Sequence, residues 1–231
     1  MTIPRLMKSL FTALALAGIP LVEASAGSII PGYPDQVETA FDPREVAWLP
    51  HYCIYTKVFR LNVPGGDNKA EIDRWRANMG PPFEWMHHYC WGLMKTNRAL
   101  MLARDKRTKT FYLKDAITEF DFFLSKTTPP RDFVLLPEIL TKKGENLIRL
   151  GRSVEGVPEL ERAIEIKPDY WPPYADLSDY YKSTGDVAKA RELLEKGLSF
   201  APDATALTRR LAELDSAKEK RKASQRETSG G

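Results

Sequence analysis

The apolar residues in the C-terminal half of the chain recur at helical spacing. Tyr174, Leu177 and Tyr181 stand at positions i, i+3 and i+7, which places them on one face of a helix. Gly185 follows, and glycine commonly ends helices because it accepts a positive φ. A second stripe of small and apolar residues comes next, made of Ala190, Leu194 and Gly197. The pattern predicts two antiparallel helices joined by a short turn.

The same pattern occurs once before, 34 residues earlier. Gly151 recurs as Gly185, and Pro168 recurs as Pro202, where proline ends the second helix. The other matched pairs are Leu140 with Tyr174, Leu147 with Tyr181, Leu160 with Leu194, Glu161 with Glu195, Ala163 with Gly197 and Ile166 with Phe200. A fixed period of this length is typical of stacked helical hairpins, which commonly present a surface to another protein.

This repeat resembles the tetratricopeptide repeat (TPR) family, whose unit is a helix, a turn and a second helix. The matching residues are Tyr174, Leu177, Ser178, Tyr181, Gly185, Ala190, Leu194, Gly197 and Pro202, and in the earlier copy Leu140, Gly144, Leu147, Gly151, Gly156, Leu160, Ala163 and Pro168. The family usually has a small residue midway along the first helix, here Ser178 or Gly144, which lets two helices approach closely. Lys143 departs from the family's usual apolar residue. The resemblance implies an all-α, TPR-like helical hairpin solenoid, with units over residues 137–170 and 171–204.

Two units alone bury too little surface, so neighbouring helices are expected on both sides. Residues 204–214 carry Leu207 and Leu211 on one face and read as a capping helix. Upstream, we predict a long helix over residues 84–103 and a partner over 111–125, which form a divergent unit over 83–130. The features that resemble the family there are the Trp91-Gly92 pair and a stripe of Ala116, Phe120 and Phe123. The predicted solenoid therefore spans residues 83–215.

Residues 1–26 have the pattern of a secretory signal. Arg5 and Lys8 precede an apolar core over residues 10–22, and Ala-Ser-Ala at 24–26 has the form of a cleavage site. An uncleaved anchor is the alternative, although the apolar core is shorter than the roughly 20 residues of a membrane span. We expect the mature chain to begin near Gly27, to have no transmembrane span and to be periplasmic or secreted.

The positive charge of the chain resides in its ends. The total is +3, residues 1–26 contribute +1 and residues 216–231 contribute +3, so the intervening body carries −1. A near-neutral body gives no reason to expect a nucleic-acid partner. Residues 216–231 are predicted to be a disordered basic tail, for which a solvated end is a simpler interpretation than contact with anionic lipid or nucleic acid.

Residues 27–82 lack sustained periodicity and are predicted to form an irregular N-terminal arm with short helices. The stretch 27–41 reads as extended. Asp42-Pro43 resembles a helix start, with the carboxylate as cap and proline in the first turn. A turn over residues 63–67 leads to a short helix near 69–78, and Gly80-Pro81-Pro82 interrupts the chain.

All histidines and cysteines occur in two short segments, His51-Tyr52-Cys53 and His87-His88-Tyr89-Cys90. A Cys53–Cys90 disulfide would suit an exported chain and would close the loop between these two positions. A metal or haem site is the second interpretation, with His51, His87 and His88 as ligands; on a helix only His87 and Cys90 of the second segment share a face. Packing of both segments in an aromatic core is the third.

No nucleophile elbow, acid pair or phosphate loop is present in a recognisable setting, so we do not expect an enzyme or a cofactor. By position in the family, the first helix of each unit would line a groove that binds a partner, through Thr141, Glu145, Ile148, Arg149, Ala175, Asp179 and Lys182. Thr141 and Glu145 do not match the lysine and asparagine with which some members of the family bind a peptide's carboxylate.

The function that follows is an exported scaffold for protein–protein interaction. The expected partner is another envelope protein or peptide, in an assembly such as a secretion or pilus system. The alternative is a redox, metal- or haem-binding envelope protein that uses the two His-Tyr-Cys segments. An obligate oligomer, formed by stacking of exposed helix ends, is a third possibility.

Overall fold

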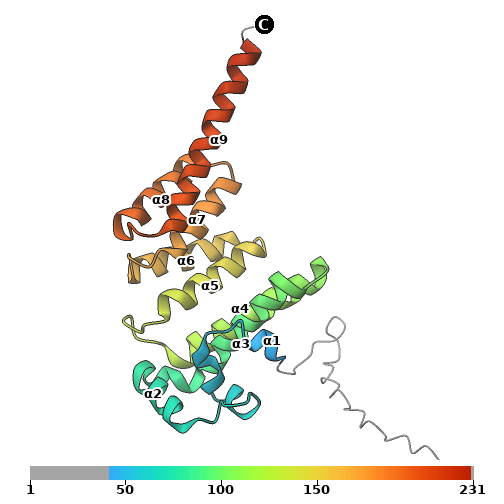
Figure 1. The fold of residues 1–231 in the computed structure, drawn as a ribbon, viewed down its shortest axis with the longest axis vertical. Coiled ribbons are helices and arrows are strands. Elements are labelled where there is room, and N and C mark those ends of the chain that lie inside the picture. Colours follow the sequence, from blue (N-terminus) through green and yellow to red (C-terminus); the bar gives the residue numbers. More distant parts are fainter. Residues whose placement is uncertain (1–41, 230–231) are drawn as a thin grey trace, which may run out of the picture. The chain divides into compact units, whose positions relative to one another are not determined.

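The computed structural model describes the backbone of residues 42–229 and the side chains of residues 42–219. The chain is all-α: no strand occurs in this range, and successive helices pack as pairs (Figure 1). The predicted signal and the extended stretch 27–41 lie outside the described residues. In order, the elements are α1 (Pro43–Val46), η1 (His51–Tyr55), η2 (Phe59–Leu61), α2 (Lys69–Met79), η3 (Pro81–Trp85), α3 (Met86–Asn97), η4 (Arg98–Leu102), α4 (Lys106–Thr127), α5 (Leu136–Arg149), α6 (Ser153–Ile166), α7 (Pro172–Ser183), α8 (Val187–Phe200) and α9 (Thr205–Ser229).

The two predicted repeat units are the hairpins α5–α6 and α7–α8, which lie side by side through α6 and α7 (Figure 1). The turn of each hairpin contains a glycine with positive φ, +80° at Gly151 and +90° at Gly185. A side chain with a Cβ rarely adopts this conformation, so the recurrence of glycine at the same place in both units reflects a backbone requirement.

Glycine also sets the distance between α5 and α6. A Cβ added to Gly144 would lie 2.8 Å from the carbonyl oxygen of Gly156, and a Cβ added to Gly156 would lie 2.7 Å from that of Gly144. The two helices therefore meet backbone against backbone. The expectation that Gly144 permits a close approach is confirmed.

Lys143, which departs from the family pattern, joins three helices. Its Nζ lies 2.7 Å from a carboxylate oxygen of Asp121 in α4 and 2.7 Å from one of Glu159 in α6. A cation is suited to this position because the preceding hairpin and the partner helix both present carboxylates to it.

The divergent unit is the hairpin α3–α4. Ala116, Phe120 and Phe123 are buried as predicted, and Gly92 of α3 packs against the ring of Phe120. The first helix begins at Met86 and not at residue 84, since the Pro-Pro sequence after Gly80 forms the separate turn η3. One turn of π-helix, η4, ends it.

Residues 42–82 belong to the segment predicted as an irregular N-terminal arm with short helices. The short helices form as expected, with Asp42 capping α1 and α2 at Lys69–Met79, but they pack onto α3 and α4. Tyr52, Phe59 and Ile72 are buried in the same hydrophobic core as Phe120. Tyr52 and Phe59 lie in two separate 3₁₀ turns, so no continuous helical stripe of apolar residues in the sequence indicated that they are buried.

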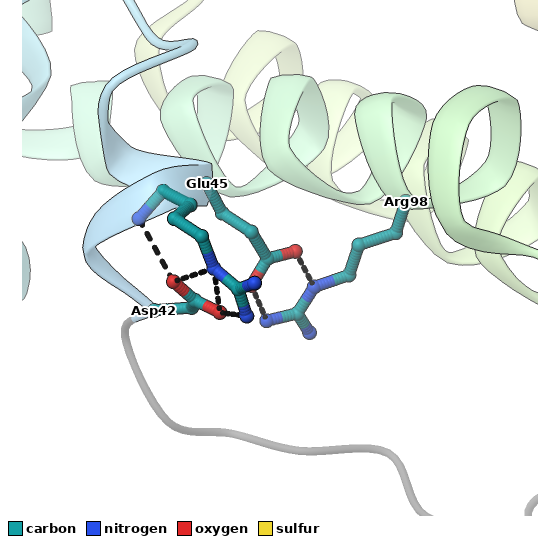
Figure 2. Close-up of polar contacts among 4 residues, drawn as sticks. Asp42, Glu45 and Arg98 are labelled. Atoms are coloured by element: carbon teal, nitrogen blue, oxygen red, sulfur yellow. Dashed lines mark hydrogen bonds and ion pairs between the residues drawn. The ribbon is translucent and has the colours of Figure 1, made fainter.

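A buried ion pair holds α1 against the end of α3 (Figure 2). Nε of Arg98 donates to Oε1 of Glu45 over 2.6 Å, and Nη2 donates to Oε2 over 2.8 Å. The two residues are 4% and 5% exposed. Figure 2 also shows Asp42, whose carboxylate accepts from the Arg44 backbone N–H over 2.8 Å at the start of α1.

The described residues form two hydrophobic cores, and α6 contributes to both. The first joins residues 49–140 with Ala163 of α6. The second extends from Leu160 and Ile164 of α6 to Leu214 of α9. Successive residues along one helix thus face different cores.

The last helix, α9, starts as predicted for the cap but continues to Ser229 (Figure 1). The structure differs here from the predicted disordered tail. Residues 216–229 are rich in alanine, lysine, glutamate and arginine, which favour helix, and neither glycine nor proline occurs between 205 and 229. Among the described residues, no helix combines the length and hydropathy required to cross a membrane.

Candidate protein-binding groove

A groove lies between α5 and α7, the first helices of the two repeat units. It has a volume of about 270 Å³. Its lining residues, which define the α5–α7 groove, are Glu145, Ile148, Arg149, Asp176, Asp179, Tyr180 and Ser183. One aliphatic and one aromatic side chain thus stand among charged groups, a mixture suited to a polypeptide with both apolar and charged side chains.

Glu145 is the most strongly paired carboxylate of the groove. Arg149 Nη2 lies 2.6 Å and Lys142 Nζ lies 3.4 Å from its oxygens. Burial pushes the pKa of Glu145 upward, but the two cations and their hydrogen bonds outweigh burial and hold the pKa below its usual value. Glu145 is therefore ionised at neutral pH and already neutralised by its neighbours.

Asp179 is paired from outside the groove. Arg210 of α9 donates to its Oδ2 from Nε over 3.0 Å and from Nη2 over 2.9 Å. This contact fixes the carboxylate on the rim and links α9 to the first helix of the second unit. A partner that approached Asp179 would compete with an existing guanidinium group.

Asp176 is different, because no hydrogen bond or ion pair to its carboxylate forms within residues 42–219. Burial and the nearby charge of Glu145 raise the pKa of Asp176 to about 7. The carboxyl group is thus poorly solvated, has no ion-pair partner among these residues and lines the groove. A partner's ammonium or guanidinium group would relieve both deficits.

Four of the predicted groove residues line the groove: Glu145, Ile148, Arg149 and Asp179. Thr141 and Ala175 do not, which corrects the prediction for these two positions. Both are buried, and Thr141 Oγ1 donates to the Pro137 carbonyl over 2.7 Å. They occupy equivalent positions of the two units, and in each unit that position is turned inward. Lys182 also lies outside the groove lining, 3.9 Å from Glu213 of α9.

Asp176, Tyr180 and Ser183 line the groove but were absent from the prediction. The signal that would have found them is helical spacing, since residues three and four apart share a helix face: Asp176 and Ser183 stand at −3 and +4 from Asp179, and Tyr180 stands at +4 from Asp176. Comparison of the two repeat units does not indicate an acidic groove residue at this position, because the residue equivalent to Asp176 in the earlier unit is the basic Lys142.

The cysteines of the two His-Tyr-Cys segments are joined. Cys53 of η1 and Cys90 of α3 form a disulfide, with an S–S distance of 2.07 Å and a Cα–Cα distance of 5.7 Å. Both are fully buried. The bond connects the irregular N-terminal turns to the first long helix, and it leaves neither sulfur as a thiolate ligand.

The three histidines have separate surroundings. His51 lies 3.5 Å from the Tyr55 hydroxyl, and His88 Nδ1 lies 2.6 Å from Glu119 of α4. His87 is buried, and burial together with the charges of His88 and Lys57 lowers its pKa to about 4. Residues 42–219 contain no group of three or more His, Cys, Asp or Glu arranged to hold a metal ion. The metal or redox alternative is therefore not favoured.

The fold and the groove define a class: an all-α scaffold of helical hairpins, stacked in chain order, with a groove on the first helices. The model of the tetratricopeptide repeat family matches residues 172–204, which comprise α7, α8 and the following turn. Residues 172–204 are thus identified as a tetratricopeptide repeat, a unit that commonly presents a surface to another protein. No curated protein sequence matches the chain.

Proposed function

We propose that the chain is an exported scaffold that assembles or stabilises a cell-envelope complex, such as a secretion or pilus system. The α5–α7 groove binds a segment of another envelope protein. The observation that carries the binding site is the groove itself, which lies between the first helices of two TPR units and contains a carboxylate without a cation.

The groove favours a segment with a basic side chain beside an apolar one. Glu145 and Asp179 already have cationic neighbours, so an incoming lysine or arginine gains most from Asp176. Ile148 and Tyr180 offer apolar surface, one from each of the two helices. Charge complementarity of this kind selects among partners more than it adds affinity.

Export is supported by two independent features of the chain. Residues 1–26 have the pattern of a secretory signal. The disulfide between Cys53 and Cys90 is of the kind that forms and persists in oxidising compartments. Mass spectrometry of the protein from its native host checks this proposal: the expected chain begins near Gly27 and contains no free thiol, whereas an intact, reduced chain in the cytosol would contradict it.

The binding proposal is tested by affinity capture from the native envelope. The wild-type chain and Asp176→Lys are used as baits, with Glu161→Lys as the matched control because Glu161 is exposed on α6, outside the groove. The same partners should be recovered with wild type and Glu161→Lys and lost with Asp176→Lys. Recovery of the same partners with all three baits would refute the groove as the binding site. Asp176→Asn, which keeps the shape of the side chain, separates loss of charge from misfolding.

A further inference from the structure

The turn that joins α3 to α4 exposes three consecutive aliphatic side chains. Leu100, Met101 and Leu102 are 41%, 58% and 48% exposed. Single exposed apolar residues are common on soluble proteins, but an uninterrupted exposed run is unusual unless it has a function.

The backbone holds this run on the surface. Leu100, Met101 and Leu102 belong to η4, a single π-helical turn in which the Ala103 N–H donates to the Arg98 carbonyl over 2.8 Å. Such π turns occur frequently at functional sites. The turn begins at Arg98, which Glu45 anchors in the interior (Figure 2). The apolar side chains thus stand on a fixed support.

Basic residues follow directly. Arg104, Lys106, Arg107 and Lys109 are all exposed, and none of them forms an ion pair with another residue of the range 42–219. The only acid between residues 98 and 109 is Asp105, which caps α4 by accepting from the N–H and the hydroxyl of Thr108. Residues 104–109 therefore carry a net charge of +3.

We propose that residues 100–109, named here the α3–α4 tip, dock the protein on the surface of an anionic lipid bilayer. Leu100, Met101 and Leu102 enter the boundary between headgroups and acyl chains, while the four basic side chains contact lipid phosphates. Aliphatic residues beside unpaired cations are the combination that interfacial membrane segments use. Lysine is depleted at interfaces between proteins, whereas the tip carries Lys106 and Lys109 beside its apolar run, a composition that suits lipid phosphates better.

The tip is separate from the α5–α7 groove, because none of the groove residues lies on η4 or α4. Membrane docking and partner binding therefore do not compete for the same side chains. Docking at the tip would position a scaffold beside the bilayer while the groove stays available.

Vesicle flotation of the full chain tests the proposal. Vesicles of phosphatidylcholine alone are compared with vesicles that also contain phosphatidylglycerol. The apolar segment 10–22 and the basic α9 are common to all variants, so the comparison between variants reports the tip. We expect Lys106→Glu/Arg107→Glu to lower binding to the anionic vesicles about tenfold and to leave binding to neutral vesicles unchanged. The matched charge control is Lys196→Glu/Arg209→Glu, on exposed positions of α8 and α9, which should bind like wild type.

Insertion of the apolar side chains into the bilayer is tested by a separate variant and by a fluorescent probe. Leu100→Ser/Met101→Ser/Leu102→Ser should lower binding to the anionic vesicles as strongly as the charge change, whereas Val154→Ser, at an 89% exposed site on α6, should not. Met101→Cys is the second measurement, because both native cysteines are bonded to each other and a dye will attach only at position 101. The emission of an environment-sensitive dye there should shift to the blue with anionic vesicles and stay unchanged with neutral ones.

Three results would overturn membrane docking. One is equal binding of wild type and both tip variants to anionic vesicles, and another is an unshifted dye at position 101 on vesicles that carry the protein. The third is a tip that binds no lipid but whose variants abolish self-association or the recovery of an acidic protein partner. Circular dichroism of each variant, expected to match wild type because the altered side chains are exposed, excludes misfolding as the cause.

Discussion

The N-terminal region, residues 42–127, and the repeat region, residues 136–229, are held together by different means. The N-terminal region is stabilised by a disulfide, a buried ion pair and a core rich in aromatic residues. The repeat region is stabilised by features that occur in both repeat units, such as the glycine in each turn and the buried apolar face of each helix. A single change should therefore damage the first region more than the second, because no repeated contact compensates for it.

Removal of the buried ion pair should have the largest effect. Glu45→Ala leaves the Arg98 guanidinium in the interior without its carboxylate, which costs about 3–5 kcal/mol of unfolding free energy. Denaturant titration followed by circular dichroism measures the loss. Glu45→Ala/Arg98→Met, which removes both charges, should recover part of it. A loss of under about 1 kcal/mol for Glu45→Ala would mean that water reaches the pair.

Opening the disulfide should have the next largest effect. Cys53→Ala/Cys90→Ala removes a link with a sequence separation of 37, which corresponds to about 3–4 kcal/mol in the chain-entropy account. The midpoint of urea unfolding reports this change, and a reducing agent should produce it in wild type but not in the variant. An unchanged midpoint in both experiments would contradict a structural role for the bond.

Alanine at the helix-contact glycines should cost less, and by a similar amount in both regions. Gly92→Ala places a methyl group that overlaps the Phe120 ring unless the ring shifts, and Gly144→Ala places one 2.8 Å from the Gly156 carbonyl. We expect about 1–3 kcal/mol for each, reduced by the better helix propensity of alanine. Urea unfolding of the two single variants measures both losses.

Double variants sharpen this glycine comparison. Gly144→Ala and Gly156→Ala widen the same contact, so their effects on unfolding free energy should be less than additive. Gly92→Ala and Gly144→Ala lie in different hairpins, and their effects should add. Additivity in both pairs would show that α5 and α6 do not meet through their glycines.

The response of stability to pH should have opposite signs in the two regions. The pKa of His87 is about 4 in the folded chain against 6.5 ordinarily, so the unfolded chain binds an extra proton between these values and stability falls on acidification. The pKa of Asp176 is about 7 against 3.8, so the folded chain holds the extra proton and stability falls as pH rises from about 4 to 7.

Two variants isolate these titrations. Relative to wild type, His87→Gln should gain stability as pH falls below about 6.5, and Asp176→Asn should gain stability as pH rises toward about 7. Thermal melting of both variants and wild type from pH 4 to 8 provides the measurement. Parallel curves for all three chains would remove both groups as sources of pH dependence.

The repeat region could be predicted well because its apolar residues obey a helical period and its glycines mark the turns. The hairpins α5–α6 and α7–α8, and the close approach at Gly144, follow from that pattern. The burial of Tyr52 and Phe59 could not be predicted in this way, since short 3₁₀ turns do not extend far enough to show a period. For the groove, the pattern identified the helices and four lining residues but placed Thr141 on the wrong face of α5.

The two faces of α6 have a consequence for any attempt to divide the molecule. Ala163 completes one core, while Leu160 and Ile164 begin the other. If the chain were cut before α6, the upstream fragment would lose the Ala163 side chain from its core. If it were cut after α6, the downstream fragment would lose Leu160 and Ile164 from its core. Neither half is a self-sufficient fragment, so a recombinant piece of this protein is best made by trimming from the termini inward.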